Sequence, residues 1–342
     1  MKTFLSLSRW ICCLLLFPFG AAFCKDLTVV SWGGHFQEVQ RQLVYKPFSL
    51  QTGTRISALS WDGGMEPLRG NAAWDVVIVD PNELMTGCRE GLFAIINWAT
   101  IGGRQRFISN AVTDCGVGAN VYSLVLSYDG SRLPVAPQSW VDLWNVKRFP
   151  GKRALRKGPK TNLEIALLAD GVKLEEVYVQ LATPAGIDRA FKKLSQLKPN
   201  VVWWEYGVEP QDLLANGQAV MASAYNIRVS AANVDNQRHL KMVWHNSLNF
   251  MDFWVIPKAS LQKNEAEQFI AYATSSLVQK SIAEKIPYGQ TRKGIAGHVE
   301  DSRMQDILGN PNYLSPSLYI NEQFWQDNQV KLTERFNQLM LK

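Results

Sequence analysis

The sequence contains few of the residues on which metal sites and nucleophilic catalysis depend. Its 342 residues include 5 cysteines and 4 histidines, with no CxxC pair and no mixed His-Cys array. It also lacks a GxSxG turn, an HExxH pair and a glycine-rich phosphate loop, and no motif surrounds His239, His245 or His298. We therefore expect no metal, no cofactor and no catalytic activity.

Long apolar runs are also scarce, and the one near the N-terminus is too short to span a bilayer. Residues 1–24 carry two basic side chains, the apolar run ICCLLLFPF and the small residues GAA, a pattern typical of a secretory signal peptide. Cys24 would suit a lipoprotein signal, but the bulky Phe23 before it makes this the less favoured alternative. Because no later stretch reaches about 18 apolar residues, we expect a soluble periplasmic protein without a transmembrane helix.

The chain is only mildly basic. Its formal net charge is +6, which falls to +4 when Lys2 and Arg9 leave with the signal peptide. This excess does not indicate nucleic-acid binding. A basic cluster lies at 147–160, where a solvated surface loop is the commoner interpretation and an anion site the alternative. Cys88 and Cys115 remain after processing, and either a disulfide or two buried thiols would fit.

Strands and helices alternate along the chain, which predicts an α/β protein with parallel sheets and crossover helices. We expect strands at 27–32, 54–60, 74–80, 120–129, 220–225 and 250–257. We expect helices at 36–50, 162–170, 186–197, 212–217 and 321–340, and two more within 263–286. About 318 mature residues exceed one typical core, so two lobes are predicted, with a boundary in the Pro- and Gly-rich stretch after residue 129.

Several short segments then point to a family. These are SWGGHFQ, KPFSLQTGTRI, WDVVIVD, LLANGQAVMASAYNIR, FMDFWVIPK, IPYGQT and FWQDN. Through their order and spacing, the whole mature chain resembles the periplasmic spermidine/putrescine-binding proteins of ABC transporters. The resemblance implies a monomeric receptor that captures a polyamine or related small organic cation and delivers it to a membrane permease. Ferric-ion and small-anion receptors on the same fold are the alternatives.

The resemblance also implies a two-lobe periplasmic binding protein fold, in which each lobe is a mostly parallel sheet flanked by helices and the ligand lies between the lobes. Lobe I is expected to comprise 25–130 and 254–296, and lobe II 131–253 and 297–342. Crossings near 129–132 and 250–257 would act as the hinge. Trp203 and Trp204 are expected to pack mainly in a core.

Carboxylates for a ligand's ammonium groups are implied at two positions. Asp252 is a charge inside the apolar strand FMDFW, which is costly unless something pairs with it, and a ligand ammonium would be that partner. Glu164 opens a helix, where a first-turn glutamate that complements the helix dipole is an equal alternative. Asp80 ends the strand WDVVIVD where the family more often has a hydroxyl residue. It would be either a further acid or a cap of the next turn.

Aromatic and polar contacts are implied by the same matching. Trp32 follows a strand and precedes Gly33 and Gly34, which allow a turn beside the ligand, and its ring could face an ammonium. The other ring positions are Tyr225, Phe250 and Tyr288, and Gln326 matches a polar contact. His35 lies where an aromatic is frequent, with a surface histidine as an equal alternative.

Thr161 stands where some members of the family carry a second acid. Together with Asp80, it predicts a ligand whose ammonium faces lobe I and whose other end is less basic or uncharged.

Overall fold

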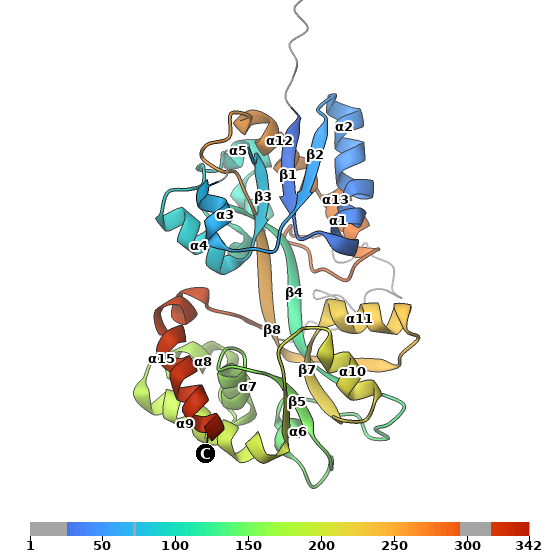
Figure 1. Ribbon diagram of the computed structural model, residues 1–342, viewed down its shortest axis with the longest axis vertical. Helices are drawn as coiled ribbons and strands as arrows, with labels where there is room; N and C mark the ends of the chain where they lie inside the picture. The colour runs from blue at the N-terminus through green and yellow to red at the C-terminus, as the bar shows by residue number, and fades with distance from the viewer. Residues whose placement is uncertain (1–25, 71–72, 295–315, 342) are drawn as a thin grey trace, which may run out of the picture.

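Two long antiparallel strands run through both lobes of the molecule (Figure 1). They are β4 (Val117–Asp129) and β8 (Leu240–Val255), which pair along most of their length. The strand expected at 250–257 is therefore the C-terminal part of a longer one that connects the lobes. The computed structural model describes residues 26–70, 73–294 and 316–341, so the expected signal peptide lies outside the described residues.

One mixed sheet contains all the named strands of the described residues, in the order β2-β1-β3-β8-β4-β7-β5-β6 with β9 on β8. The remaining bounds are β1 (Leu27–Ser31), β2 (Ile56–Ser60), β3 (Val76–Val79), β5 (Arg153–Arg156), β6 (Val201–Trp204), β7 (Met221–Tyr225) and β9 (Leu318–Tyr319). Strands β2, β1 and β3 are parallel, as are β6, β5 and β7. The mostly parallel sheets expected in the two lobes are thus joined into one sheet by β4 and β8.

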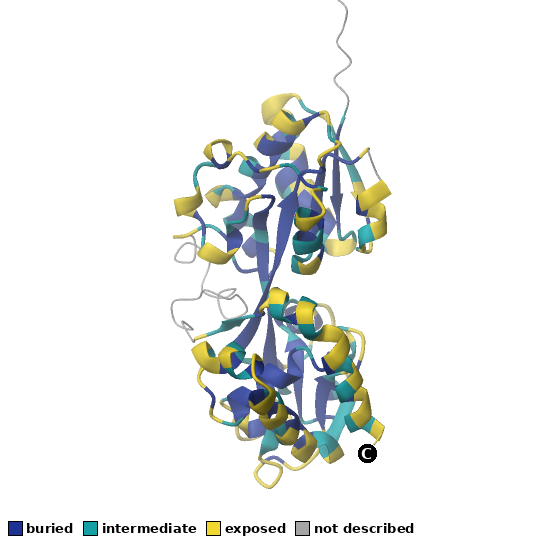
Figure 2. Ribbon diagram, turned by 90° about the vertical axis from the view of Figure 1, so that its left-hand side faces the viewer, coloured by how far each residue is buried: buried dark blue, intermediate teal, exposed yellow. Residues whose placement is uncertain are grey.

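Helices surround the sheet in both lobes, and their outer faces carry most of the exposed residues (Figure 2). In lobe I they are α1 (Gly34–Gln40), a π-helical segment (Arg41–Tyr45), α2 (Lys46–Thr52), α3 (Met65–Gly70), α4 (Pro81–Arg89), α5 (Trp98–Ile101), α12 (Lys263–Ala273) and α13 (Ser276–Ala283). In lobe II they are α6 (Val141–Trp144), α7 (Asn162–Ala169), α8 (Val177–Leu181), α9 (Pro184–Leu197), α10 (Glu209–Ala215), α11 (Asn226–Asp235) and α15 (Glu322–Leu341). Each helix expected from the sequence is present, with bounds that differ by a few residues.

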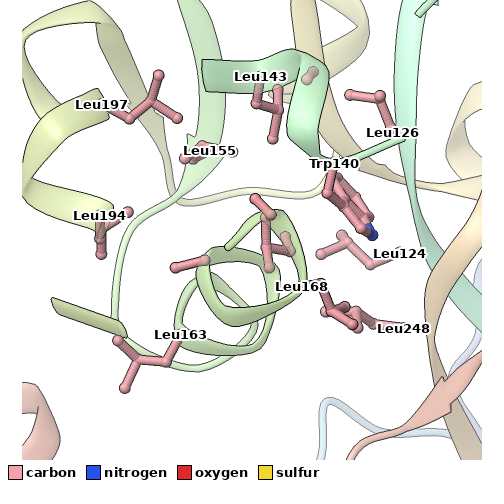
Figure 3. Close-up of a cluster of buried hydrophobic side chains, with 14 of the residues drawn as sticks. Leu124, Leu126, Trp140, Leu143, Leu155, Leu163, Leu168, Leu194, Leu197 and Leu248 are labelled. Atoms are coloured by element: carbon pink, nitrogen blue, oxygen red, sulfur yellow. The ribbon is translucent and has the colours of Figure 1, made fainter. Parts of the chain in front are cut away.

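The core of lobe II forms around α7, which is buried along its whole length (Figure 3). Because apolar residues lie on all sides of α7, the helix can only be stable inside a lobe. Trp204 belongs to this core, and Trp203 packs against it with its ring 5.2 Å from that of Phe336. The expectation that this tryptophan pair packs in a core is confirmed.

A second buried cluster fills lobe I. Along β4 the buried residues change from one cluster to the other between Val121 and Leu124, and along β8 between Phe250 and Met251. The boundaries predicted after residues 130 and 253 remain predictions, and we propose that the lobes meet at these changes.

A disulfide joins Cys88 to Cys115, whose Cα atoms are 6.1 Å apart. It links the C-terminal turn of α4 to the segment that precedes β4. Of the two alternatives left open by the sequence, the disulfide is the one found.

Candidate ligand-binding site

Asp252 lies where β8 enters lobe I, at the lobe junction, the region where β4 and β8 pass between the lobes. It pairs across the sheet with Asn120 and is 4% exposed. Its Oδ2 accepts hydrogen bonds from the Asn120 amide at 3.0 Å and from the Trp32 indole N–H at 3.1 Å. Burial nevertheless raises the pKa of Asp252 to about 7, and the charges of Asp80 and Glu83 add to the rise. The two donors only partly offset the cost of burying this carboxylate.

Trp32 is held in place by the end of β1 and by a second tryptophan. Gly33 and Gly34 have positive φ angles of 73° and 55°, so the chain turns directly after Trp32 into α1. The Trp32 ring stacks on Trp61, with centroids 5.5 Å apart and planes 6° from parallel. The Trp61 N–H in turn donates to the Ile78 carbonyl at 3.1 Å. This stack fixes the Trp32 N–H on Asp252.

Asp80 caps α4, so the turn-cap interpretation of this residue is confirmed. Its Oδ1 accepts from the Glu83 N–H at 2.7 Å, and Glu83 Oε2 accepts from the Asp80 N–H at 2.9 Å. Burial raises the pKa of Glu83, whose Oε1 also accepts from the Gly64 N–H. Sequence reasoning missed Glu83, although an acid three residues after an N-cap is the signal of a capping box. A ligand contact from Asp80 stays a prediction.

Three aromatic rings lie side by side at the junction. Tyr122 and Phe250 face each other across β4 and β8 and stack with centroids 5.3 Å apart. The Tyr225 ring meets both edge-on, at 5.8 Å from Tyr122 and 6.0 Å from Phe250. The register that pairs Tyr122 with Phe250 also pairs Asn120 with Asp252, so these four side chains share one face of the sheet. The sequence analysis did not include Tyr122. Its spacing of two residues from Asn120 could have shown that both side chains lie on the same face of the strand.

Tyr288 and His35 occupy different environments. Tyr288 is buried and meets the Phe36 ring at 5.1 Å, and burial together with the nearby Asp252 charge raises its pKa. His35, at the start of α1, is exposed, which agrees with the surface alternative. Ligand contacts from both residues stay predictions, and Phe36 is the ring that the structure places beside Tyr288.

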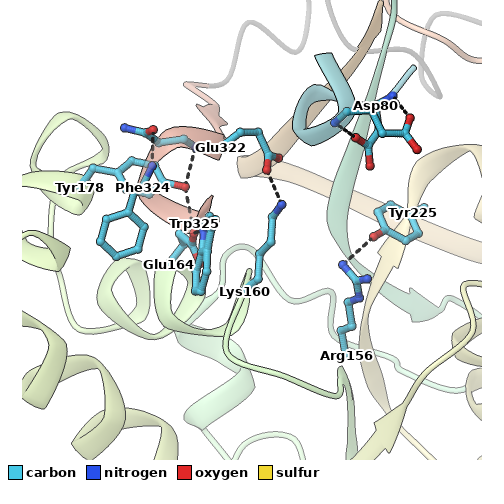
Figure 4. Close-up of polar contacts among 11 residues, drawn as sticks. Asp80, Arg156, Lys160, Glu164, Tyr178, Tyr225, Glu322, Phe324 and Trp325 are labelled. Atoms are coloured by element: carbon cyan, nitrogen blue, oxygen red, sulfur yellow. Dashed lines mark hydrogen bonds and ion pairs between the residues drawn. The ribbon is translucent and has the colours of Figure 1, made fainter. Parts of the chain in front are cut away.

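Two cations reach the junction from lobe II (Figure 4). Arg156 ends β5, and its Nη1 lies 3.4 Å from the Tyr225 hydroxyl. Lys160 lies in the loop before α7, 6.0 Å from the Phe250 ring centroid, and its Nζ pairs with Glu322 at 2.6 Å. Lys157 between them is exposed, as expected of a solvated loop. The loop interpretation of 147–160 is wrong for Arg153–Arg156, which form the mostly buried strand β5, and two cations of the cluster, Arg156 and Lys160, lie at the junction.

Glu164 is fully buried in the first turn of α7, which agrees with the helix-dipole alternative. Its Oε1 accepts from the Tyr178 hydroxyl at 2.9 Å and from the Trp325 indole at 2.6 Å, while its Oε2 has no partner among the described residues. Burial raises its pKa. Thr161, also fully buried, has a positive φ of 75°. Ligand contacts from Glu164 and Thr161 stay predictions, since the described partners of Glu164 come from lobe II itself.

The comparisons with known proteins agree with this architecture. Residues 64–305 match the profile of the bacterial extracellular solute-binding proteins. The chain belongs to this family. It is therefore an extracellular solute-binding receptor of ABC transporters, a class that is in general non-enzymatic.

Individual members of the family cover nearly the whole chain. The gamma-aminobutyric acid-binding protein of Pseudomonas aeruginosa is 42% identical over 331 residues, which are 93% of this chain and 94% of the relative. Among solved structures, the Atu4243 GABA receptor has a TM-score of 0.78 and 28% identity, over 92% of this chain and 97% of that one. An ABC transporter substrate-binding protein from Bradyrhizobium japonicum has a TM-score of 0.80 and 28% identity, over 92% and 99%.

The predicted receptor class and the two-lobe fold are confirmed by these matches, whereas the narrower polyamine family is not supported by them. Within the ranges that the structure describes, every helix is too short or too polar to span a membrane. The same residues hold no cluster of three or more His, Cys, Asp or Glu side chains suited to a metal ion.

Gln326 connects the two lobes of this solute-binding protein. It lies on α15 of lobe II, and both of its described partners lie on α4 of lobe I. Its Nε2 donates to the Thr86 hydroxyl at 3.0 Å, and its Oε1 accepts from the Arg89 guanidinium. The predicted ligand contact of Gln326 is untested, but these bonds can form only when the lobes approach each other.

Gln326→Ala is therefore expected to favour the open form of the ligand-free receptor. Each of the two lost hydrogen bonds is worth about 0.5–1.5 kcal/mol, so the radius of gyration should increase and ligand affinity should fall by about fivefold to a hundredfold. Small-angle scattering with and without ligand measures the radius of gyration, and calorimetry measures the affinity. Gln323→Ala is the matched control, because the only described hydrogen-bond partner of that amide is Asp327 of the same helix. Equal scattering from the two variants would contradict a bridging role.

Proposed function

We propose that this protein binds a small ω-amino acid of the γ-aminobutyric acid type in the periplasm and presents it to an ABC permease. The observation that carries the proposal is the opposite charge of the two sides of the lobe junction. Lobe I contributes Asp252, with the acids of the α4 cap beside it, and lobe II contributes Arg156 and Lys160. A ligand with an ammonium at one end and a carboxylate at the other complements both sides.

Each group of such a ligand has a suitable partner. The ammonium would neutralise Asp252, whose burial is not fully offset by its two hydrogen bonds. The methylene chain would lie on the rings of Tyr122 and Phe250, which bring apolar surface between the charges. The carboxylate would meet the guanidinium of Arg156, whose planar fork fits both carboxylate oxygens.

The names of two relatives support this ligand class. A relative with 42% identity and a structure with 28% identity are both named for γ-aminobutyric acid. In an α-amino acid the ammonium and the carboxylate are attached to the same carbon. In this receptor, Asp252 and Arg156 lie on different lobes. We therefore favour ligands whose ammonium and carboxylate are separated by several methylenes.

A short diamine such as putrescine is the second candidate. It is favoured by the number of carboxylates near the junction, where the charge of Asp80 raises the pKa of both Asp252 and Glu322. Arg156 and Lys160 oppose it, because they would repel the second ammonium. A longer polyamine such as spermidine meets the same repulsion.

Calorimetry of the purified mature protein tests the ligand class. We expect γ-aminobutyrate to bind with a Kd of about 1 μM, which corresponds to about 8 kcal/mol. Butylamine and butyrate each lack one charged group, so each should bind at least about thirtyfold more weakly. β-Alanine and 5-aminovalerate then vary the distance between the charges. Tighter binding of putrescine than of γ-aminobutyrate would favour the diamine, and binding of neither would refute both proposals.

A further inference from the structure

The ammonium of Lys160 already has a carboxylate partner from its own chain. Glu322, in the first turn of α15, places its Oε2 2.6 Å from Lys160 Nζ. The two side chains are only 10% and 22% exposed, whereas the neighbouring pair of Lys157 and Glu205 is 55% and 57% exposed. Water therefore screens the Lys160 pair far less than the Lys157 pair.

Glu322 also lies within electrostatic range of both sides of the junction. Burial raises the pKa of Glu322, Lys160 and Arg156 oppose that rise, and Asp80 from lobe I adds to it. Its carboxylate is thus close to the lobe II cations and to an acid of lobe I. The charge that lobe II presents to a ligand depends on whether Glu322 is ionised and paired.

We propose that Glu322 is a specificity-determining residue, an internal counter-ion that occupies Lys160 where a ligand carboxylate would bind. This inference rests on the proposed function. In the empty receptor Glu322 pairs with Lys160 and also lies within electrostatic range of Arg156, so it offsets positive charge on the lobe II side. When a ligand carboxylate arrives, it must share or replace this contact, so Glu322 weakens binding of carboxylates and favours ammonium groups.

The start of α15 does not depend on Glu322 for its position. The Trp325 indole donates to buried Glu164 at 2.6 Å, and the Asn321 N–H donates to the Tyr178 hydroxyl at 2.8 Å. Trp325, with Leu332 and Phe336 further along the helix, is buried in the lobe II core. Replacing Glu322 should therefore change charge at the junction and leave the helix in place.

Glu322→Gln tests the inference in the full mature chain, with γ-aminobutyrate and putrescine as the two probes in calorimetry. We expect the variant to bind γ-aminobutyrate about tenfold more tightly than wild type and putrescine about tenfold more weakly, because close charge pairs couple by more than about 1.4 kcal/mol. Glu205→Gln removes the same charge from the exposed partner of Lys157, which lies on the same loop as Lys160, and should change either affinity by less than about fivefold. Glu322→Asp keeps the charge and should retain the wild-type preference.

Three results would overturn the inference while leaving the proposed function intact. The first is an unchanged ratio of the two affinities in Glu322→Gln when wild type binds γ-aminobutyrate. The second is an equal change in Glu205→Gln, which would show a general effect of net charge. The third is weaker γ-aminobutyrate binding in Glu322→Gln, since Glu322 would then support Lys160 in binding. A wild-type protein that binds neither probe would overturn both proposals.

Discussion

Asp252→Asn is expected to lose ligand binding and to stabilise the empty receptor at the same time. The amide has nearly the shape of the carboxylate and can still accept from Trp32 and Asn120 through its oxygen. It carries no charge, however, so a bound ammonium would be buried without a counter-ion. That loss is about 2–5 kcal/mol, or between about thirtyfold and a few thousandfold in Kd.

The gain in stability follows from the direction of the Asp252 pKa shift. Burial raises this pKa from 3.8 to about 7, so between these values the folded state holds a proton that the unfolded chain has released. Stability is therefore lost as pH rises through this range, by about 1.4 kcal/mol per unit, to a total of roughly 4 kcal/mol above pH 7. Asparagine does not ionise, so the variant avoids this loss.

Thermal unfolding of ligand-free wild type and Asp252→Asn from pH 4 to pH 8 measures this gain in stability. The variant should have the higher Tm at pH 8, and the difference should vanish near pH 4, where Asp252 is protonated in wild type. Asp114→Asn makes the same substitution at an exposed ion pair with Arg104 and should show no such pH dependence. Wild-type affinity in Asp252→Asn, or a lower Tm at pH 8, would contradict the assignment.

The affinity of the wild-type protein for an amine should depend on the protonation state of Asp252. Binding requires ionised Asp252, so Kd should rise about tenfold per unit as pH falls below 7. Calorimetry across pH 5–8 checks this slope.

The local features of the fold could be predicted because they depend on neighbours in the sequence. Apolar runs bounded by Gly or Pro gave strands and helices close to their observed bounds, and the Gly pair after Trp32 marked a turn that the structure contains. Asp252 stood out for the same reason, since a carboxylate within FMDFW has no local means of compensation. The union of both sheets by β4 and β8 could not be seen, because it depends on the pairing of strands more than a hundred residues apart.

The lobe II side of the site was harder to predict. Arg156, Lys157 and Lys160 are similar in the sequence, and only the fold decides which cations turn towards the junction. Lys160 and its partner Glu322 are separated by 162 residues. Glu164 was named as a site residue only because of the family resemblance. The sequence did not show that its hydrogen-bond partners would be Trp325 on α15 and Tyr178 on α8.

Arg156→Gln is expected to reverse the ligand preference of the receptor. Arg156 ends β5, whose pairing with β6 and β7 fixes the backbone, and its guanidinium is held beside the Tyr225 hydroxyl. Without this cation, a buried carboxylate would lose its bidentate partner, at a cost of about 2–5 kcal/mol. A diamine should instead bind as well as before or better, since a repelling charge has been removed.

Titration of wild type and variants with γ-aminobutyrate and putrescine measures this reversal. Lys157→Gln removes the same charge from the neighbouring exposed position and should shift both affinities by less than about fivefold. Arg156→Lys keeps the charge but not the planar fork, so an intermediate loss would show that geometry contributes beyond attraction. If Arg156→Gln and Lys157→Gln behave alike, the ligand's carboxylate does not lie at Arg156, and Lys160 becomes the principal cation of the site.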